Sequence, residues 1–190
     1  MDVPFFNYKN FCKDLNYKLL LEEVLDTGYL IGGPFVEELE NKIQVITGIK
    51  HCITVGNATD AMEIIFKFLD LPFNSKVLVP SHTMLATASA AKSANLIPIP
   101  VDVDPDSLLL EIKQLEKCNL KGVSACMITQ LNGIVADMEP IKDFCESNKI
   151  YLIEDSAQGI GAFNGEKHSG SWGVGGCVSF YPAKVAGGIG

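Results

Sequence analysis

The sequence contains no arginine. Its 15 basic residues are all lysine, and together with 23 acidic residues they leave a formal net charge of -8 at pH 7. Nucleic acid and anionic membrane surfaces repel a chain of this charge, so we expect a small molecule as its main partner. A buried carboxylate needs a positive partner, and without arginine that partner has to be a lysine or a cationic group on a ligand.

Signals for metal sites, disulfides and membranes are absent as well. The six cysteines form no C-x-x-C pair, and no histidine stands at metal-ligand spacing from them. Neither a zinc site nor a disulfide framework is indicated, and reduced thiols favour the cytoplasm. No apolar run approaches the length of a membrane span, and the N-terminus lacks the hydrophobic core of a signal peptide. We expect a cytoplasmic protein that binds no metal, nucleic acid or membrane.

Short β-branched runs alternate with stretches of helical periodicity along the chain. Hydrophobic residues make up 47% and charged residues 20%, as in globular domains. Strands separated by helices imply right-handed crossovers, so the sequence predicts a three-layer α/β/α fold with a mainly parallel sheet. Such a sheet binds ligands beyond the carboxyl ends of its strands. The expected strands are 51–55, 77–79, 97–101, 123–128, 150–153 and 174–180, and the expected helices are 11–26, 34–47, 58–69, 84–94, 107–117 and 137–148.

The first loop after an expected strand contains Asn57, Ala58 and Thr59 and leads into a helix. Backbone N–H groups at a helix N-terminus bind phosphate, and the Thr59 hydroxyl adds a donor. Asn57 and Thr59 are also typical helix caps, which is the structural alternative. The loop is not a Walker loop, because no Gly-Lys-Ser/Thr follows it.

The next three loops offer weaker candidates. His82 and Met84 follow the second strand; a lone loop histidine is typical of a surface position, and Met84 can cover a flat ring or pack in the core. The segment 104–107, Asp-Pro-Asp-Ser, predicts a turn and a helix cap rather than a metal site. Gln130 and Asn132 follow the fourth strand, where each can contact a ligand or shape a turn.

Two adjacent acids, Glu154 and Asp155, end the fifth expected strand. Side chains alternate along a strand, so the two carboxylates point to opposite faces and cannot form a pair in one site. Only one of them can therefore serve as the working acid. Because the chain has no arginine, that acid needs a ligand cation or a lysine.

The last expected strand leads to Ser179 and Lys184, which flank a turn containing proline and glycines. In this arrangement a hydroxyl can bind a phosphate oxygen while an amine reaches a carbonyl carbon. A solvated surface charge is the alternative interpretation of Lys184. The residues alone leave both open.

Six segments in this order give the chain a resemblance to a known family. They are GYLIGGPFVEELE (28–40), NATDA (57–61), PSHT (80–83), ADM (136–138), EDSAQ (154–158) and SFYPAK (179–184). Together they resemble the DegT/DnrJ/EryC1/StrS sugar aminotransferases, pyridoxal-phosphate (PLP) enzymes of the aspartate-aminotransferase fold type I. Each segment is weak alone, whereas six at the family's intervals are highly specific.

The resemblance implies a role for each site residue. Lys184 matches the lysine that holds the cofactor as a Schiff base and shuttles a proton, and Asp155 matches the partner of the protonated pyridine nitrogen. The Asn57 loop with Ala58 and Thr59, together with Ser179, matches the phosphate-binding positions. Gln158 matches a contact on the hydroxyl side of the ring, and Met84 the position that stacks on it.

The activity implied by the resemblance is an amino transfer in two stages. An amino donor, by family habit glutamate, leaves its nitrogen on the cofactor, which then aminates a nucleotide-linked keto-sugar. The family also implies a homodimer. The sequence ends six residues after Lys184. We therefore expect residues 1–190 to be the N-terminal portion of the PLP-binding large domain, with the rest of that domain and the C-terminal small domain absent from this chain.

Two departures from the family pattern and three alternative functions accompany this interpretation. Met84 stands where the family commonly stacks an aromatic ring, and Gln130 replaces a common histidine. A PLP-dependent sugar dehydratase carries histidine at the position of Lys184, so the lysine argues against it. A non-catalytic or regulatory module that kept the fold is the alternative from another class. A dinucleotide-dependent dehydrogenase is disfavoured, because residues 159–164 lack the final glycine of its motif and do not follow the first strand.

Overall fold

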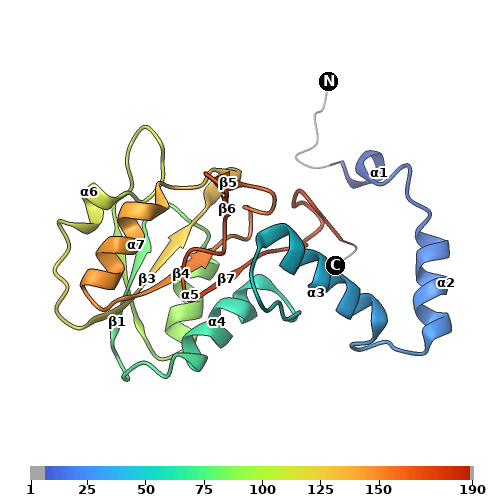
Figure 1. Ribbon diagram of the computed structural model, residues 1–190, viewed down its shortest axis with the longest axis horizontal. Coiled ribbons are helices and arrows are strands. Elements are labelled where there is room, and N and C mark those ends of the chain that lie inside the picture. Colours follow the sequence, from blue (N-terminus) through green and yellow to red (C-terminus); the bar gives the residue numbers. More distant parts are fainter. Residues whose placement is uncertain (1–6, 189–190) are drawn as a thin grey trace.

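The computed structural model describes residues 7–188, apart from the side chains of Tyr8 and Phe11; the expectations for the first six and last two residues lie outside this range. Five parallel strands form the central sheet in the order β2-β1-β3-β4-β7 (Figure 1). A separate antiparallel pair, β5 and β6, precedes β7. The strands are β1 (Lys76–Pro80), β2 (Ile97–Val101), β3 (Val123–Thr129), β4 (Tyr151–Asp155), β5 (Phe163–Asn164), β6 (Lys167–His168) and β7 (Gly175–Cys177).

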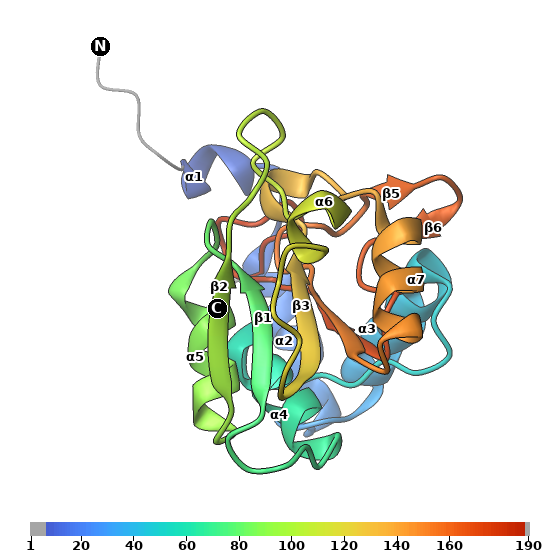
Figure 2. The same cartoon turned by 90° about the vertical axis from the view of Figure 1, so that its left-hand side faces the viewer.

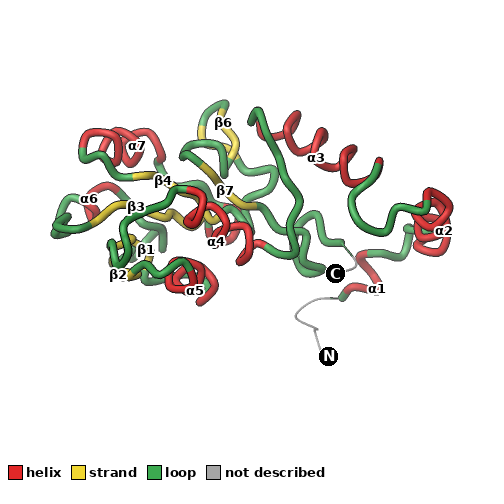
Figure 3. The backbone as a smooth tube through the Cα atoms, turned by 90° about the horizontal axis from the view of Figure 1, so that it is seen from below, coloured by secondary structure: helices red, strands yellow, loops and turns green. Residues whose placement is uncertain are grey.

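Helices cover both faces of the sheet, which Figure 3 shows nearly edge-on. The helices α4 and α5 lie on one side, and α6 and α7 lie on the other (Figure 2). The three-layer α/β/α prediction is therefore confirmed. The helices are α1 (Tyr8–Phe11), α2 (Tyr17–Thr27), α3 (Pro34–Thr47), α4 (Ala58–Phe68), α5 (Leu85–Ser93), α6 (Ile112–Leu115), α7 (Met138–Ser147) and the 3-10 turn η1 (Leu131–Gly133).

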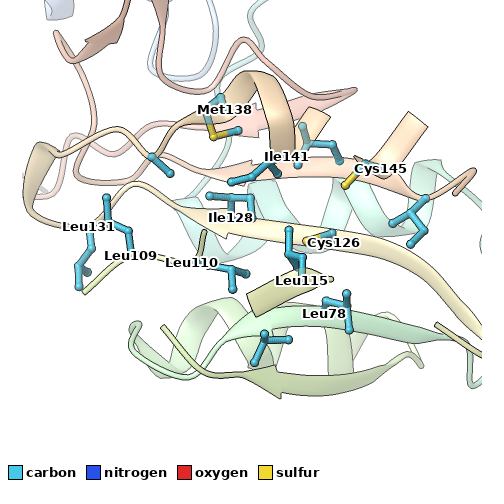
Figure 4. Packing of buried hydrophobic residues seen from close by; sticks show 14 residues of the cluster. Leu78, Leu109, Leu110, Leu115, Cys126, Ile128, Leu131, Met138, Ile141 and Cys145 are labelled. Atoms are coloured by element: carbon cyan, nitrogen blue, oxygen red, sulfur yellow. The ribbon is translucent and has the colours of Figure 1, made fainter. Parts of the chain in front are cut away.

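Side-chain alternation along the strands creates two hydrophobic cores. On β3, Cys126 and Ile128 point into the core beneath α6 and α7, where they meet Met138 and Ile141 (Figure 4). Met127 points the other way, into the core beneath α4 and α5. This period-2 pattern decides which strand-end residues reach which side of the sheet.

The N-terminal helices lie apart from the sheet. Figure 1 shows α2 at the opposite end of the molecule from α6, and none of the residues of α2 is buried. Its leucine side chains stay exposed, for example Leu21 at 58% and Leu25 at 52%. Helix α3 begins at Pro34, as predicted, and buries Ile43 and Thr47. Among the described residues, each helix is too short or too polar to cross a lipid bilayer.

The expected strand 51–55 is wrong. The segment is an irregular loop in which Ile53 is 79% exposed. It is held instead by Glu40 of α3, whose Oε1 accepts hydrogen bonds from the Thr54 N–H (2.7 Å) and the Thr54 hydroxyl (3.0 Å). β-Branched residues favour a strand only where a neighbouring strand pairs with them, and here none does.

Three expected elements differ from the structure by more than two residues at one end. The helix expected at 11–26 is divided: α1 ends at Phe11, and α2 begins at Tyr17, after the cap residue Asn16 accepts the Leu19 N–H (3.3 Å). The helix expected at 107–117 shrinks to α6, because the preceding residues form a turn in which Leu108 has a φ of 59°. The strand expected at 174–180 is limited to β7.

β2 forms one edge of the sheet and contains two prolines, Pro98 and Pro100. Ile97 pairs inward, donating its N–H to the Ser75 carbonyl (2.9 Å). Successive residues of a strand direct their N–H groups to opposite sides, so both prolines occupy positions whose N–H would point away from β1.

The turn predicted at 104–107 is confirmed, whereas the helix cap predicted there is wrong, because α6 begins only at Ile112. Asp104 is buried, and its Oδ1 accepts the N–H groups of Asp106 and Ser107, each at 3.0 Å. Its Oδ2 pairs with Lys113 of α6. The interaction with Lys113 and the N–H of Ser107 lower the pKa of Asp104 from 3.8 to about 2. The carboxylate thus joins the loop after β2 to α6.

Because this pKa is lowered on folding, the ionised carboxylate stabilises the fold above pH 4, and the contribution is lost as the pH falls towards 2. We expect Asp104→Asn to lower the free energy of unfolding by the same amount at pH 7 and pH 5, and by less at pH 3. Urea denaturation at the three values measures this difference. Asp102→Asn, at an exposed position nearby, is the control. A deficit in Asp104→Asn that does not change with pH would contradict the role of the charge.

Candidate active site

The carboxyl ends of β3, β4 and β7 bring three site residues into one row. The strand register sets Thr129 opposite Asp155, and Asp155 opposite Cys177. Ile153 and Cys177 belong to the core beneath α4 and α5, and Asp155 follows Ile153 by two residues. Asp155 therefore points to the α4 and α5 side of the sheet.

Asp155 is 4% exposed, and all its partners are neutral. Its Oδ2 accepts a hydrogen bond from the Thr87 hydroxyl of α5 (2.6 Å). Its Oδ1 accepts from the Ala157 N–H (3.2 Å) and the Cys177 thiol (3.8 Å). Burial, followed by the charge of Asp155, raises the pKa of Cys177, so this thiol stays protonated. None of the ion pairs among residues 7–188 includes Asp155. A buried carboxylate that forms no ion pair among the described residues suits a positively charged ligand group.

Glu154 points to the opposite face, as predicted, and has a structural role. It is fully buried, and its Oε1 accepts the N–H groups of Trp172 (2.6 Å) and Gly173 (3.2 Å). Its Oε2 accepts from the Gly170 N–H (2.8 Å) and the Gln130 side-chain amide (3.0 Å). Glu154 thus anchors the loop that leads into β7.

The start of α4 combines a helix cap with open donors. Asn57 caps the helix, since its Oδ1 accepts the Asp60 N–H (2.9 Å), and its carbonyl accepts the Ala61 N–H (3.0 Å). The structural alternative is therefore confirmed for Asn57. The N–H groups of Ala58 and Thr59 have no hydrogen-bond partner among the described residues. Two donors at a helix N-terminus suit an anion such as a phosphate.

The remaining candidate residues in the strand-end loops differ in their exposure and in their hydrogen-bond partners. Gln158 uses its Oε1 to accept the Asn132 N–H (2.7 Å), which fixes the loop after β3 beside the loop after β4. Met84 is 61% exposed at the start of α5. His82 is exposed, and its Nδ1 lies 3.3 Å from the Leu108 carbonyl oxygen.

Gln130 is fully buried, so it does not line a ligand site. Besides the bond to Glu154, its amide donates to the Met138 sulfur (3.2 Å) and its Oε1 accepts the Ala136 N–H (2.9 Å). The suggestion that Gln130 touches a ligand is wrong for this arrangement. Both of its amide protons are donated inside the core.

Lys184 lies on the predicted turn beyond β7. Its N–H donates to the Tyr181 carbonyl (2.8 Å), and the Gly188 N–H donates to the Phe180 carbonyl (2.7 Å). Gly187 leaves no room for a side chain, because a Cβ there would lie 2.2 Å from the Pro182 carbonyl oxygen. The lysine is half-buried. The hydrogen-bonded backbone of this turn thus fixes the position from which the Lys184 side chain extends.

Ser179 precedes this turn, and its hydroxyl oxygen accepts the Tyr181 N–H (3.3 Å). Two hollows elsewhere, of about 520 and 490 Å³, are lined mainly by α3 and by α7 with the start of β4. Neither contains a residue expected at the site. The chemistry points to the strand ends rather than to these hollows.

Comparison with known proteins decides the family. The model of the DegT/DnrJ/EryC1/StrS aminotransferase family matches residues 12–188. The chain belongs to this family. The resemblance derived from six short segments is therefore confirmed.

Two curated relatives show the range of names in the DegT/DnrJ/EryC1/StrS family. The UDP-2-acetamido-2-deoxy-3-oxo-D-glucuronate aminotransferase of Pseudomonas aeruginosa is 34% identical over 88% of this chain and 46% of its own length. A pleiotropic regulatory protein of Geobacillus stearothermophilus is 31% identical over 100% of this chain and 52% of its own. The chain thus spans about half the length of the curated relatives it matches.

A solved structure links the family's fold to its cofactor. NtdA from Bacillus subtilis, solved with bound cofactor PMP, superimposes with a TM-score of 0.89 and 26% identity. The superposition covers 100% of this chain and 43% of the other. The family is PLP-dependent, and the buried, cation-free carboxylate and open helix N-terminus described above fit a cofactor that has a protonated ring nitrogen and a phosphate.

Glu154 provides a test of how the site is supported. We expect Glu154→Gln to lower the free energy of unfolding by about 3 kcal/mol. The amide NH2 group of the substituted side chain would face N–H donors, which then lose their acceptor. Urea denaturation measures the loss, and limited proteolysis shows whether residues 168–173 become accessible. Glu38→Gln, which removes an exposed ion pair with Lys42, is the control and should cost less than about 1 kcal/mol. Equal losses in the two variants would contradict the anchoring role.

Proposed function

We propose that the protein is a PLP-dependent aminotransferase that moves an amino group, from glutamate, to a nucleotide-linked keto-sugar. The observation that carries the proposal is the buried carboxylate of Asp155, which has neutral partners only, in a chain of an aminotransferase family. We propose further that residues 1–190 are the N-terminal portion of the large domain, and that the full-length protein works as a cytoplasmic homodimer. The sugar substrates named for relatives such as the P. aeruginosa enzyme support the substrate class.

The chain's own residues divide the work of holding the cofactor. Asp155 would bind the protonated ring nitrogen and keep it charged. The N–H groups of Ala58 and Thr59, at a helix start capped by Asn57, would bind the phosphate together with the Ser179 hydroxyl. Gln158 would contact the hydroxyl side of the ring from the position fixed by Asn132, and the exposed thioether of Met84 would pack on its face.

Lys184 is the proposed catalytic base. Pyridoxal phosphate, when bound, supplies an electron sink that makes the substrate carbon acidic. The Lys184 amine would hold the cofactor covalently and, when released, take and return a proton at Nζ. Hydrogen bonds on both sides of Lys184 hold its backbone in the closed turn around Gly187, so the amine would move by rotation of the side chain.

A second candidate function is a regulatory module that retains the fold. The name of the G. stearothermophilus relative, a pleiotropic regulatory protein, supports this second candidate. The two functions differ in one measurable property, since an aminotransferase must react with an amino donor and a purely structural module need not. Absorbance of bound PLP that changes on addition of glutamate supports the enzyme.

Substitution of Lys184 tests the proposed base. We expect Lys184→Ala in the full-length protein to abolish the visible absorbance of covalently held PLP and to lower amino transfer at least about a thousandfold, because the nucleophile and the base are lost together. Spectrophotometric titration with PLP and a coupled transfer assay measure the two effects. Lys117→Ala, at an exposed position, is the matched control. Retention of the absorbance or of the activity in Lys184→Ala would refute the assignment.

The amino donor can be identified in a half-reaction without the sugar. We expect glutamate to shift the absorbance of the PLP-loaded protein and to yield one equivalent of 2-oxoglutarate, as a two-stage transfer requires. Aspartate and alanine are the comparison donors. The regulatory candidate predicts that none of the three changes the spectrum.

A further inference from the structure

Three threonine hydroxyls form a hydrogen-bonded chain that ends on Asp155. Thr129 Oγ1 lies 2.9 Å from Thr83 Oγ1, and Thr83 Oγ1 lies 2.7 Å from Thr87 Oγ1. Thr87 Oγ1 in turn lies 2.6 Å from Asp155 Oδ2. None of these threonines was expected at the site from the sequence.

The negative charge of Asp155 determines which group donates and which accepts in each hydrogen bond of this threonine series. An ionised carboxylate only accepts, so the single hydroxyl proton of Thr87 has to point at Oδ2. Thr87 then accepts the proton of Thr83, and Thr83, having used its only proton, accepts that of Thr129. Hydroxyl dipoles aligned in this way polarise one another, which strengthens the last bond to the carboxylate.

The three hydroxyls come from separate parts of the fold. Thr129 ends β3 directly opposite Asp155, Thr83 lies in the loop after β1, and Thr87 lies in the first turn of α5. Thr87 is fully buried and Thr129 is 6% exposed. The hydrogen-bonded threonines therefore connect the carboxyl ends of β1, β3 and β4 through one carboxylate oxygen of Asp155. At this buried position, water cannot replace a lost donor.

We propose that Thr87, held by Thr83 and Thr129, is a positioning residue that fixes the Asp155 carboxylate in the plane and rotamer needed to meet the protonated nitrogen of the cofactor. Of the three groups on Asp155, it makes the shortest contact and is the sole donor to Oδ2 among the described residues. Oδ1 accepts only the longer bonds of Ala157 and Cys177, so rotation of the carboxylate is opposed mainly through Oδ2. This inference rests on the proposed function, because it assigns the purpose of the chain to PLP.

The test compares four variants of the full-length protein. Thr87→Val keeps the shape and removes the donor, Thr87→Ser keeps the donor, and Thr83→Val breaks the chain one bond further away at a half-buried site. Thr47→Val is the matched control, since this buried threonine donates within α3, to the Ile43 carbonyl (2.6 Å). The readouts are the Kd for PLP, the pH dependence of the visible absorbance, and kcat and KM measured separately.

Loss of a hydrogen bond to a charged acceptor corresponds to about a 10- to 100-fold change in an equilibrium constant. We expect Thr87→Val to weaken PLP binding by about that factor, to shift the pH profile of the absorbance and to lower kcat with little change in KM for the sugar. Thr83→Val should shift the same readouts less, and Thr87→Ser should stay within about threefold of the wild type. If Thr87→Val does not fold, Thr83→Val decides alone.

The outcomes separate this inference from the proposed function. Unchanged PLP affinity and pH profile in Thr87→Val, or in Thr83→Val if that variant alone folds, overturns the positioning role and leaves the proposed function intact. A loss of the same size in Thr47→Val, or in Thr87→Ser, assigns the effect to stability and also overturns it. A wild-type protein that binds no PLP refutes the proposed function and the inference with it.

Discussion

The burial of two adjacent carboxylates at the end of β4 is the constraint on which the site depends. Ionised groups in a core must be compensated locally, and the pleat of the strand sends Glu154 and Asp155 to different layers. Glu154 receives four donors from the loop before β7 and from Gln130. Asp155 receives two neutral hydrogen bonds and a weak thiol contact. One face of the strand end thus has a full set of hydrogen-bond donors, while the carboxylate on the other face has no cationic partner among the described residues.

This division explains how the loops at the carboxyl edge are held. The bond from Gln130 to Glu154 joins β3 to β4 beneath α7, and that from Asn132 to Gln158 joins the loops that follow these strands. The loop anchored by Glu154 runs directly into β7, and β7 leads to the turn of Lys184. The position of the lysine thus depends on a carboxylate on the face of β4 opposite to Asp155.

The sequence was sufficient for the layers and for most of the sheet, because alternation and helical periodicity are local signals. It failed at 51–55, where β-branched residues have no partner strand, and at 107–117, where the bonds of Asp104 and the positive φ of Leu108 favour a turn. It anticipated the opposite directions of Glu154 and Asp155, since this depends only on strand geometry. The threonines around Asp155 were not found, because residues 46 and 68 positions apart meet only through the parallel register. A threonine in a helix or at a strand end carries no sign of such a contact.

The prolines of β2 have a consequence for association between copies of the protein. A sheet edge recruits further strands through rows of free N–H and C=O groups, which is the route to fibrous aggregates. Pro98 and Pro100 remove two outward donors from a strand of five residues, so an approaching strand meets carbonyl oxygens without their complement. Misassembly through this edge is discouraged by the covalent structure of the backbone itself, independently of pH, salt or bound cofactor.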